Sequence, residues 1–305
     1  MKAYFNRFGR PILSYLSISL AFIYISVFIC TIPQNYKIEM YDSTEKFNYP
    51  FIELVERTNE KVFSLLSLDL GRSMTGDREL NYLISGPLVS TAVLLIGGIL
   101  LSVLLGIIKG ILDSRKGEGD GSSLKILSTI IPISLPDVLL IALLQKLAIY
   151  LSRYGIDVFK VAGSGTISHL LLPWLALSIL PACYIARTTA VSIEECYARD
   201  FIKVAEGKGC PSFRILWTHV MKNCIGPIIG SLPSITTILI GNLIMVEYLF
   251  NYPGLVRSFF GFLRNNDRNG IIANIVILGL VYFSLDLLFK LCKAMFVKKL
   301  RGETV

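Results

Sequence analysis

Six long runs of apolar residues are the feature that most restricts how this chain can fold. Each is about as long as the roughly 20 residues that a helix needs to cross the hydrocarbon core of a bilayer. Of the 305 residues, 53% are hydrophobic and only 17% are charged, which leaves too little polar surface for a soluble domain. The runs lie at about residues 11–33, 86–112, 124–150, 167–190, 225–250 and 271–294. Because backbone amides in lipid must be satisfied within a segment, the sequence predicts an all-α, polytopic membrane protein with six transmembrane helices.

The first run follows Lys2, Arg7 and Arg10, as the apolar core of a secretory signal peptide would. The run is longer than such a core, and no small-x-small cleavage pattern follows it. Bulky residues stand directly before Cys30, which argues against lipoprotein processing. We therefore expect this run to be retained as the first transmembrane helix.

Lysine and arginine are distributed unevenly between the two sides of the predicted bundle. Basic residues beside short loops favour the cytoplasm. If the N-terminus is inside, eighteen of them lie on that side: Lys2, Arg7, Arg10, Lys109, Arg115, Lys116, Lys125, Arg187, Arg199, Lys203, Lys208, Arg214, Lys222, Lys290, Lys293, Lys298, Lys299 and Arg301. The two short outside loops and their flanks hold six: Lys146, Arg153, Lys160, Arg257, Arg264 and Arg268. Both termini are therefore predicted to be cytoplasmic, and the net charge of +8 reflects topology rather than nucleic-acid binding.

This topology predicts four parts of the chain. Residues 1–33 form a tail and the first transmembrane helix, and the mildly acidic residues 34–85 form an extracytoplasmic segment. Residues 86–294 form a core of five helices that contains a cytoplasmic loop at 191–223. Residues 295–305 form a cytoplasmic tail.

Patterns for catalysis or metal binding are weak. The six cysteines have no CxxC spacing and read as small apolar residues, and the two histidines, His169 and His219, cannot form a three-histidine site. No phosphate-binding loop of the G-x-x-x-x-G-K-[ST] type occurs, so the chain itself is not expected to hydrolyse ATP. Ser164 stands near His169 but in a glycine-rich outside loop, away from the membrane depth that an intramembrane protease requires. We therefore predict no catalytic residue and no metal ligand.

The loop at 191–223 is charged and aromatic in a chain that is otherwise apolar. Its first half has the period of an amphipathic helix, with apolar positions at Ile193, Tyr197, Phe201, Val204 and Ala205. Gly207 and Gly209 are expected to end this helix, and Pro211 suits the first turn of another. A second apolar stripe follows at Phe213, Leu216, Trp217, Val220, Met221 and Cys224. Two helices lying on lipid headgroups would also fit this pattern, whereas a DNA-binding helix-turn-helix would not, because both ends are anchored in the membrane.

The residues of this loop resemble the cytoplasmic EAA loop of ABC transporter permeases, in the form found in dipeptide, oligopeptide and nickel importers. The matching positions are Asp200, Phe201, Ile202, Ala205, Gly207, Lys208, Gly209, Arg214, His219, Lys222 and Asn223. Four other stretches resemble segments of the same family, in the same order and spacing, at 67–74, 133–144, 169–187 and 246–259. The resemblance therefore covers most of the chain.

The resemblance implies the type I ABC importer permease fold in a bacterial cell membrane. In that family the loop docks a short coupling helix on a cytosolic ATPase, so the expected coupling residues are Tyr197, Arg199, Asp200, Phe201, Lys203, Val204, Ala205, Gly207, Lys208 and Gly209. The implied partners are a second, related permease, two cytosolic ATPase subunits that carry ATP and magnesium, and an extracytoplasmic substrate-binding protein. This chain would form half of the translocation pathway, and no nucleic acid is implied.

Some positions depart from the family pattern. The Pro-Gly-Asp-Pro that commonly follows the first span is replaced by residues 31–43, and Asp137 stands where small or aromatic residues are usual. These departures leave the cargo open between a peptide and a nickel or other metal chelate. A second hypothesis, a channel or scaffold without an ATPase, predicts normal behaviour when the loop at 191–223 is altered.

Charged residues within transmembrane segments are costly and are often functional. Lys146 and Asp286 stand near the ends of predicted spans and are interpreted as snorkelling side chains. Glu247 either bonds a loop amide or lines the translocation path, and Asp137 either lines the path or forms a buried pair.

Overall fold

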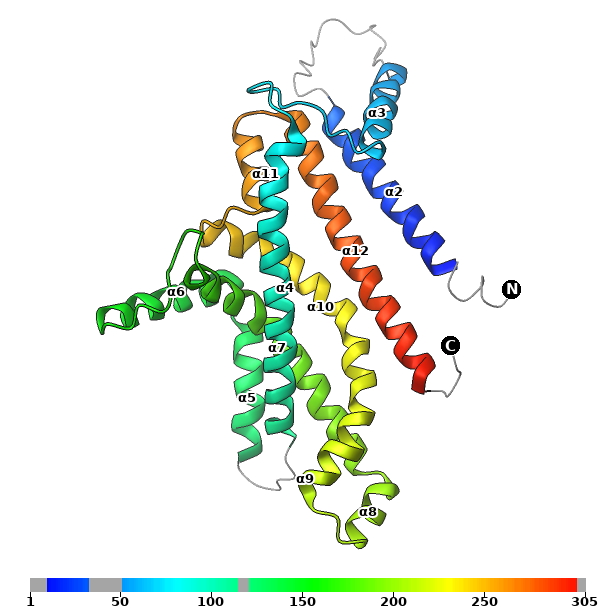
Figure 1. Ribbon diagram of the computed structural model, residues 1–305, viewed down its shortest axis with the longest axis vertical. Helices are drawn as coiled ribbons and strands as arrows, with labels where there is room; N and C mark the ends of the chain where they lie inside the picture. Colours follow the sequence, from blue (N-terminus) through cyan, green and yellow to red (C-terminus); the bar gives the residue numbers. More distant parts are fainter. Residues whose placement is uncertain (1–9, 33–50, 115–120, 301–305) are drawn as a thin grey trace, which may run out of the picture. The chain divides into compact units, whose positions relative to one another are not determined.

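A computed structural model of the chain describes residues 10–32, 51–114 and 121–300. Within these residues the regular elements are helices, apart from one isolated bridge between Arg72 and Glu79 (Figure 1). Five helices are long and apolar enough to cross a membrane, or six if the bent pair α5–α6 counts as one span. The prediction of an all-α, multi-pass membrane protein is therefore confirmed. The predicted tails and the segment 34–85 fall partly at 1–9, 33–50 and 301–305, outside the described residues.

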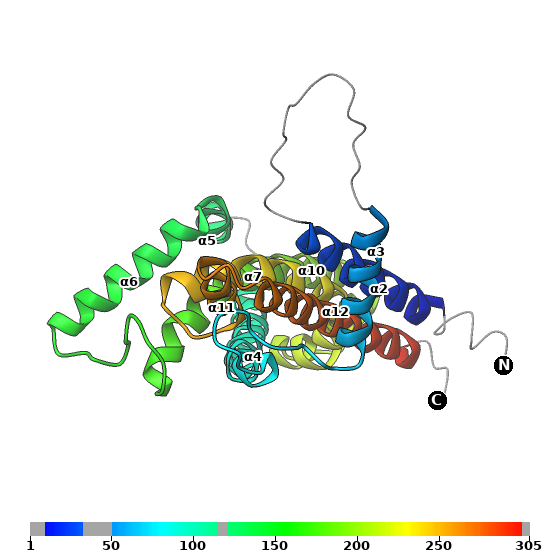
Figure 2. The same ribbon diagram turned by 90° about the horizontal axis from the view of Figure 1, so that it is seen from above.

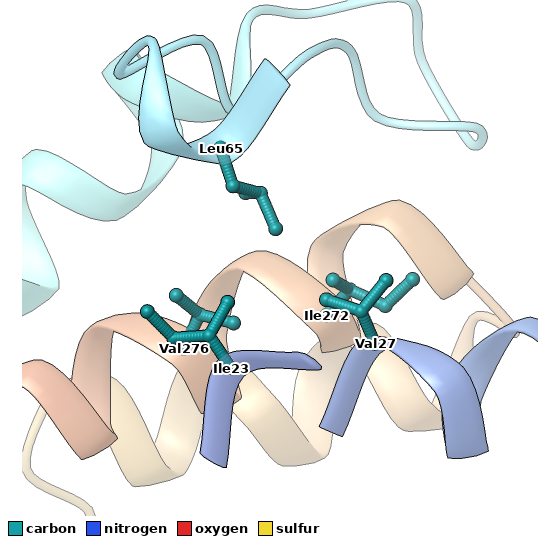
Figure 3. Close-up of a cluster of buried hydrophobic side chains, with 5 residues drawn as sticks. All are labelled: Ile23, Val27, Leu65, Ile272 and Val276. Atoms are coloured by element: carbon teal, nitrogen blue, oxygen red, sulfur yellow. The ribbon is translucent and has the colours of Figure 1, made fainter. Parts of the chain in front are cut away.

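The chain divides into two compact units, the first made of residues 1–89 and 254–284. It contains α2 (Arg10–Thr31), α3 (Phe51–Leu66), the start of α4 (Leu80–Asp113), α11 (Leu255–Arg264) and the start of α12 (Arg268–Leu300). Figures 1 and 2 both show α3 lying beside α2. One buried cluster joins three of these helices through Ile23, Val27, Leu65, Ile272 and Val276 (Figure 3). A second cluster packs the start of α4 on α11 and α12 through Leu80, Ile84, Leu255 and Ala273.

Asp267 ties the loop before α4 to the start of α12 within the first unit. The residue immediately precedes α12, and its side chain accepts a bond from the Gly270 amide at 3.0 Å, as an N-cap does. The same carboxylate accepts bonds from the Ser73 hydroxyl, the Met74 amide at 3.2 Å and the Thr75 hydroxyl at 3.4 Å. Burial alone would raise the pKa of Asp267, but these four hydrogen bonds outweigh it and hold the pKa below its ordinary value.

Because the pKa of Asp267 is lowered, its contribution to the stability of the fold depends on pH in a direction that can be predicted. A carboxylate of lowered pKa stabilises the fold above its unfolded pKa, about 3.9, and loses that contribution as the pH falls through the lower folded value. We expect the loop to stay closed from neutral pH down to about pH 4. Asp267→Asn should open it at neutral pH and speed hydrogen exchange over residues 70–79 by about tenfold or more, since bonds to charged groups contribute about 1.5–3 kcal/mol.

Asp77→Asn is the matched control for that measurement. Asp77 lies in the same loop, but its side chain is 80% exposed and pairs at 3.1 Å with Arg72, whose side chain is 62% exposed. Exposed ion pairs contribute little, so exchange in this variant should stay close to that of the wild type. Equal acceleration of hydrogen exchange in both variants would contradict the role of Asp267 in holding the loop closed.

The second unit is built from residues 90–253 and 285–305. Its centre is the packing of α7 (Ile167–Tyr197) on α10 (Met221–Leu249), which buries Leu177, Ile185 and Ile193 of α7 and Leu239 and Leu243 of α10. The remainder of α4 approaches α7 closely, because a side chain at Gly106 would meet the Ile185 side chain at 2.5 Å and the Ala182 carbonyl at 2.9 Å. Glycine and other small residues permit this close helix contact, which is common in membranes.

The third predicted span, at 124–150, is wrong as a single continuous helix. The structure has two helices there, α5 (Gly121–Ser134) and α6 (Asp137–Arg153), bent by 107°. Pro136 stands at the break, lacks an amide hydrogen and disfavours helical backbone at Leu135. The bend places Asp137 in the first turn of α6.

Candidate functional site

The loop predicted at 191–223 forms short helices at the end of the second unit where α7 stops and α10 starts (Figure 1). α7 continues past its apolar part as far as Tyr197. Arg199 then takes an extended conformation, with φ −80° and ψ 145°, and α8 begins (Asp200–Gly207). The prediction of a helix, a turn and a second helix matches this arrangement, but Tyr197 belongs to α7 rather than to the short helix.

The burial of α8 differs from the single apolar stripe expected from the sequence. Ile202 and Ala205 are the buried residues of α8, with 1% and 8% exposure. Phe201 and Val204 are 40% and 57% exposed. The break at Arg199 rotates α8 relative to α7, so the period that starts at Ile193 does not continue through it. α8 is therefore held by Ile202 and Ala205 and presents Phe201 and Val204 outward.

The polar residues predicted for this site surround the exposed apolar pair. Arg199, Asp200, Lys203 and Lys208 are all exposed. The Lys203 ammonium lies 3.1 Å from the Asp200 carboxylate, one turn earlier on α8. The exposed face of α8 is therefore apolar at its centre and carries basic groups at its edges, a pattern typical of a surface that docks on another protein.

The two glycines have different roles. Gly207 is the last residue of α8, in agreement with the expectation that the helix ends at the two glycines. Gly209 has φ +74° and ends the helix: its amide donates to Glu206 at 2.9 Å and the next amide, of Cys210, donates to Ala205 at 3.2 Å. This pair of bonds is a Schellman motif, which places glycine at the left-handed position.

The second half of the loop leads without interruption into a membrane-spanning helix. α9 (Ser212–Arg214) passes into a short π-helix, η2 (Ile215–Val220), and then into α10. Val220, Met221 and Cys224 of the second predicted stripe are buried, whereas Phe213 and Trp217 are 74% and 50% exposed. α8 therefore contacts a segment that is rigidly continuous with α10, and α8 itself follows α7.

The two residues predicted for the translocation path have different surroundings. Glu247, near the end of α10, is fully buried and accepts a 2.6 Å hydrogen bond from the Thr91 hydroxyl of α4. Its side chain is thus bonded to a hydroxyl on another helix of the same unit. Asp137 is half-buried at the start of α6. Sequence reasoning missed Thr91, since nothing in its local sequence marks it.

The two remaining charged residues within predicted spans also differ. Lys146 is exposed on α6. Asp286 is buried on α12 and lies 2.9 Å from the Lys290 ammonium, one turn later on the same helix. Asp286 is thus held in an ion pair within its helix rather than extended to the membrane surface, and the snorkelling interpretation of Lys146 stays a prediction.

The structure also shows a polar network that the sequence did not reveal. The Lys109 ammonium lies 2.8 Å from both the Asp113 carboxylate and the Ser128 hydroxyl, and the Thr129 hydroxyl donates to Asp113 at 3.1 Å. These contacts join α4 to α5. In the part of the chain that the structure describes, no group of three or more His, Cys, Asp or Glu side chains is arranged to hold a metal ion.

Residues 124–302 match a protein family described as "Binding-protein-dependent transport system inner membrane component". This match covers the bent pair α5–α6, α7, the short helices of the loop, α10, α11 and α12. The surface formed by α8 thus lies inside the matched region.

Several curated proteins are similar to this chain over most of its length. A dipeptide transport system permease protein, DppB of Alkalihalophilus pseudofirmus, is 26% identical over 250 residues, covering 72% of this chain and 75% of its own. The protein of the same name from Bacillus subtilis is 27% identical over 198 residues, or 63% of each chain. A probable peptide ABC transporter permease protein, y4tP of Sinorhizobium fredii, is 27% identical over 219 residues, covering 70% of this chain and 69% of its own.

Proposed function

The chain belongs to the family of binding-protein-dependent transport system inner membrane components, and from this premise we propose that it is one permease half of an ATP-driven peptide importer. A permease subunit of such a system is not itself an enzyme. Peptide is proposed as the cargo because the similar proteins are named as dipeptide or peptide permeases.

The observation that best supports docking of this loop on an ATPase is the exposed pair Phe201 and Val204 on α8. An exposed aromatic residue on a helix fixed by buried Ile202 and Ala205 is a suitable anchor for a pocket on a partner. Arg199, Lys203 and Lys208 would pair with acidic groups at the rim of that pocket. A partner that pushes or pulls on α8 would move α7 and α10, because α8 directly follows α7 and contacts η2, which continues into α10.

The partners proposed for this chain are a second, related permease, two cytosolic ATPase subunits and an extracytoplasmic substrate-binding protein. ATP and magnesium would bind to the ATPase subunits. The neighbouring reading frames offer a simple test: they should encode a second six-span chain, at least one ATPase with a phosphate-binding loop, and a secreted binding protein. Their absence would favour the channel or scaffold hypothesis.

We propose that the translocation path is shared with the second permease and that Asp137 faces it. The bend before α6 supports this, since a charged residue at an interrupted helix is tolerated where it meets a water-filled cavity. For Glu247, the buried bond to Thr91 supports a role in joining α4 to α10.

Uptake by a strain that lacks this chain tests the cargo. Labelled di- and oligopeptides and labelled nickel should be supplied side by side, with the restored gene as the control. We expect peptide uptake to fall to the background level and nickel uptake to stay unchanged. Loss of nickel uptake alone would replace the peptide assignment with a metal chelate, and normal uptake of both would contradict an importer of either kind.

Orientation is proposed to place both termini and α8 in the cytoplasm and residues 34–85 outside. Single cysteines at Gly76 and at Lys208, both exposed, test it in a background without the native cysteines. A membrane-impermeant maleimide should label Gly76→Cys in intact cells and Lys208→Cys only after the cells are opened. Labelling in the reverse order would invert the topology and exclude α8 as a contact for a cytosolic ATPase.

A further inference from the structure

α3 has an apolar side that is only partly covered within its unit. Leu54, Thr58 and Leu65 form its buried face. At 100° per residue, Ile52, Phe63 and Leu66 lie together in an apolar strip about 100–160° around the helix from that face, and their side chains are 75%, 74% and 54% exposed. The exposed carboxylates of Glu53 and Glu60 follow on the next side of the helix, whereas Glu56 stands seven residues before Phe63 and shares its side. Since residues 51–66 contain no long apolar run, α3 is amphipathic rather than membrane-spanning.

The contacts of α3 show how deeply it lies along α2. Its Thr58 hydroxyl is 3.2 Å from the hydroxyl of Thr31, the last residue of α2. Seven residues later, Leu65 packs on Val27 and Ile23 of α2 (Figure 3). With a rise of about 1.5 Å per residue, Val27 and Ile23 lie about 6 and 12 Å inside the end of α2.

α12 gives an independent estimate of the same depth. Leu65 also packs on Ile272 and Val276, which lie about 6 and 12 Å beyond Arg268 at the start of that helix. α2 has 22 residues, so its length of about 33 Å is close to the 30 Å of a bilayer core. The second half of α3 therefore runs alongside the membrane-embedded ends of two spanning helices.

We propose that the second half of α3 is inserted in the membrane surface at the end of α2, with Phe63 and Leu66 in contact with lipid acyl chains. The neighbouring helices at this depth are themselves surrounded by lipid, so an exposed apolar strip at the same level meets lipid rather than water. The carboxylates of Glu53 and Glu60, on the next side of α3, stay in water, as in other interfacial helices. Leu68 extends the strip: it is 81% exposed and takes φ +62° just after α3.

Photocrosslinking in the native membrane tests the lipid contact. A benzophenone-bearing amino acid would replace Phe63, Leu66 or, as the control on the charged side, the exposed Glu53. The full chain would be expressed with its transport system, irradiated in cell membranes, and analysed by mass spectrometry for phospholipid adducts. We expect phospholipid adducts at Phe63 and Leu66 to be at least about tenfold more abundant than at Glu53.

The same variants would be irradiated after the full chain is reconstituted in vesicles of phosphatidylethanolamine and phosphatidylglycerol. Adducts with lipid at Phe63 and Leu66 in both settings support the proposal. A crosslink to a protein at these sites in cell membranes would show that the strip is a protein interface. Equal lipid adducts at all three sites, or none at any, would also overturn it. Two exposed sites are used because loss of folding in one variant then leaves the other as the test.

Discussion

Phe201→Ala is expected to abolish transport and co-purification of the ATPase while the chain remains in the membrane at its normal level. Phe201 is 40% exposed, so its removal leaves the packing of Ile202 and Ala205 intact. Truncating a central aromatic anchor commonly costs about 2 kcal/mol or more of binding free energy. Because 1.4 kcal/mol is a factor of ten, docking should weaken by about thirtyfold or more.

Phe213→Ala is the matched control, since it removes the same side chain from the same loop. Phe213 is 74% exposed, its ring is tilted against that of Trp217 with 6.2 Å between the ring centroids, and it is not among the residues predicted for coupling. We expect this variant to keep its ATPase partner and its transport rate. Full transport by Phe201→Ala would show that α8 rests on lipid headgroups, and loss of the ATPase in Phe213→Ala alone would place the docking surface on α9.

The spans were largely predictable because hydrophobic length alone defines them. The runs at 86–112 and 271–294 correspond to α4 and α12, which continue beyond the apolar residues at both ends. Length could not reveal the bend at Pro136, since a window of apolar residues has the same hydropathy whether its backbone is straight or broken. Pro132 and Pro136 were visible in the sequence, but prolines at 173, 181, 227 and 233 lie inside continuous helices. The neighbouring packing, rather than proline alone, decides which helix breaks.

The composition of the loop at 191–223 was predictable, but its exposed face was not. A helical period gives the correct face only while the helix continues, and Arg199 interrupts it. For this reason Phe201 and Val204 are exposed although they continue the stripe of the buried Ile193. The exposed position of this pair suits the coupling role that the resemblance implies for Phe201 and Val204.

Contacts between distant parts of the chain were not predictable from local patterns. Thr91 and Glu247 are 156 residues apart, and Ser73 and Asp267 are 194 apart. Nothing close to any of these residues in the sequence indicates its partner, because tertiary packing alone brings them together. Glu247 was one of four charged residues that the sequence singled out within predicted spans, and its bond to Thr91 offsets part of the cost of burying a carboxylate.

Gly209→Val is expected to abolish transport by a different route from Phe201→Ala. A Cβ atom added at Gly209 would find no atom within 4 Å, so crowding at Cβ is not the cause of the expected effect. The backbone at φ +74° is the cause: a non-glycine residue there costs about 1–3 kcal/mol, and a β-branched one is especially unfavourable. The end of α8 should then unwind or shift, which moves Lys208 and the exposed face out of register with the partner.

Gly209→Asn separates this conformational effect from crowding at the interface. Asparagine tolerates the left-handed conformation and is found at the same position of other Schellman motifs. It is larger than alanine, so a partner in close contact with Gly209 would exclude it. We expect transport close to the wild-type rate for Gly209→Asn and loss of transport for Gly209→Val, with equal membrane levels of both. If both variants lose transport, the partner approaches Gly209 itself, and the left-handed backbone is not what coupling requires.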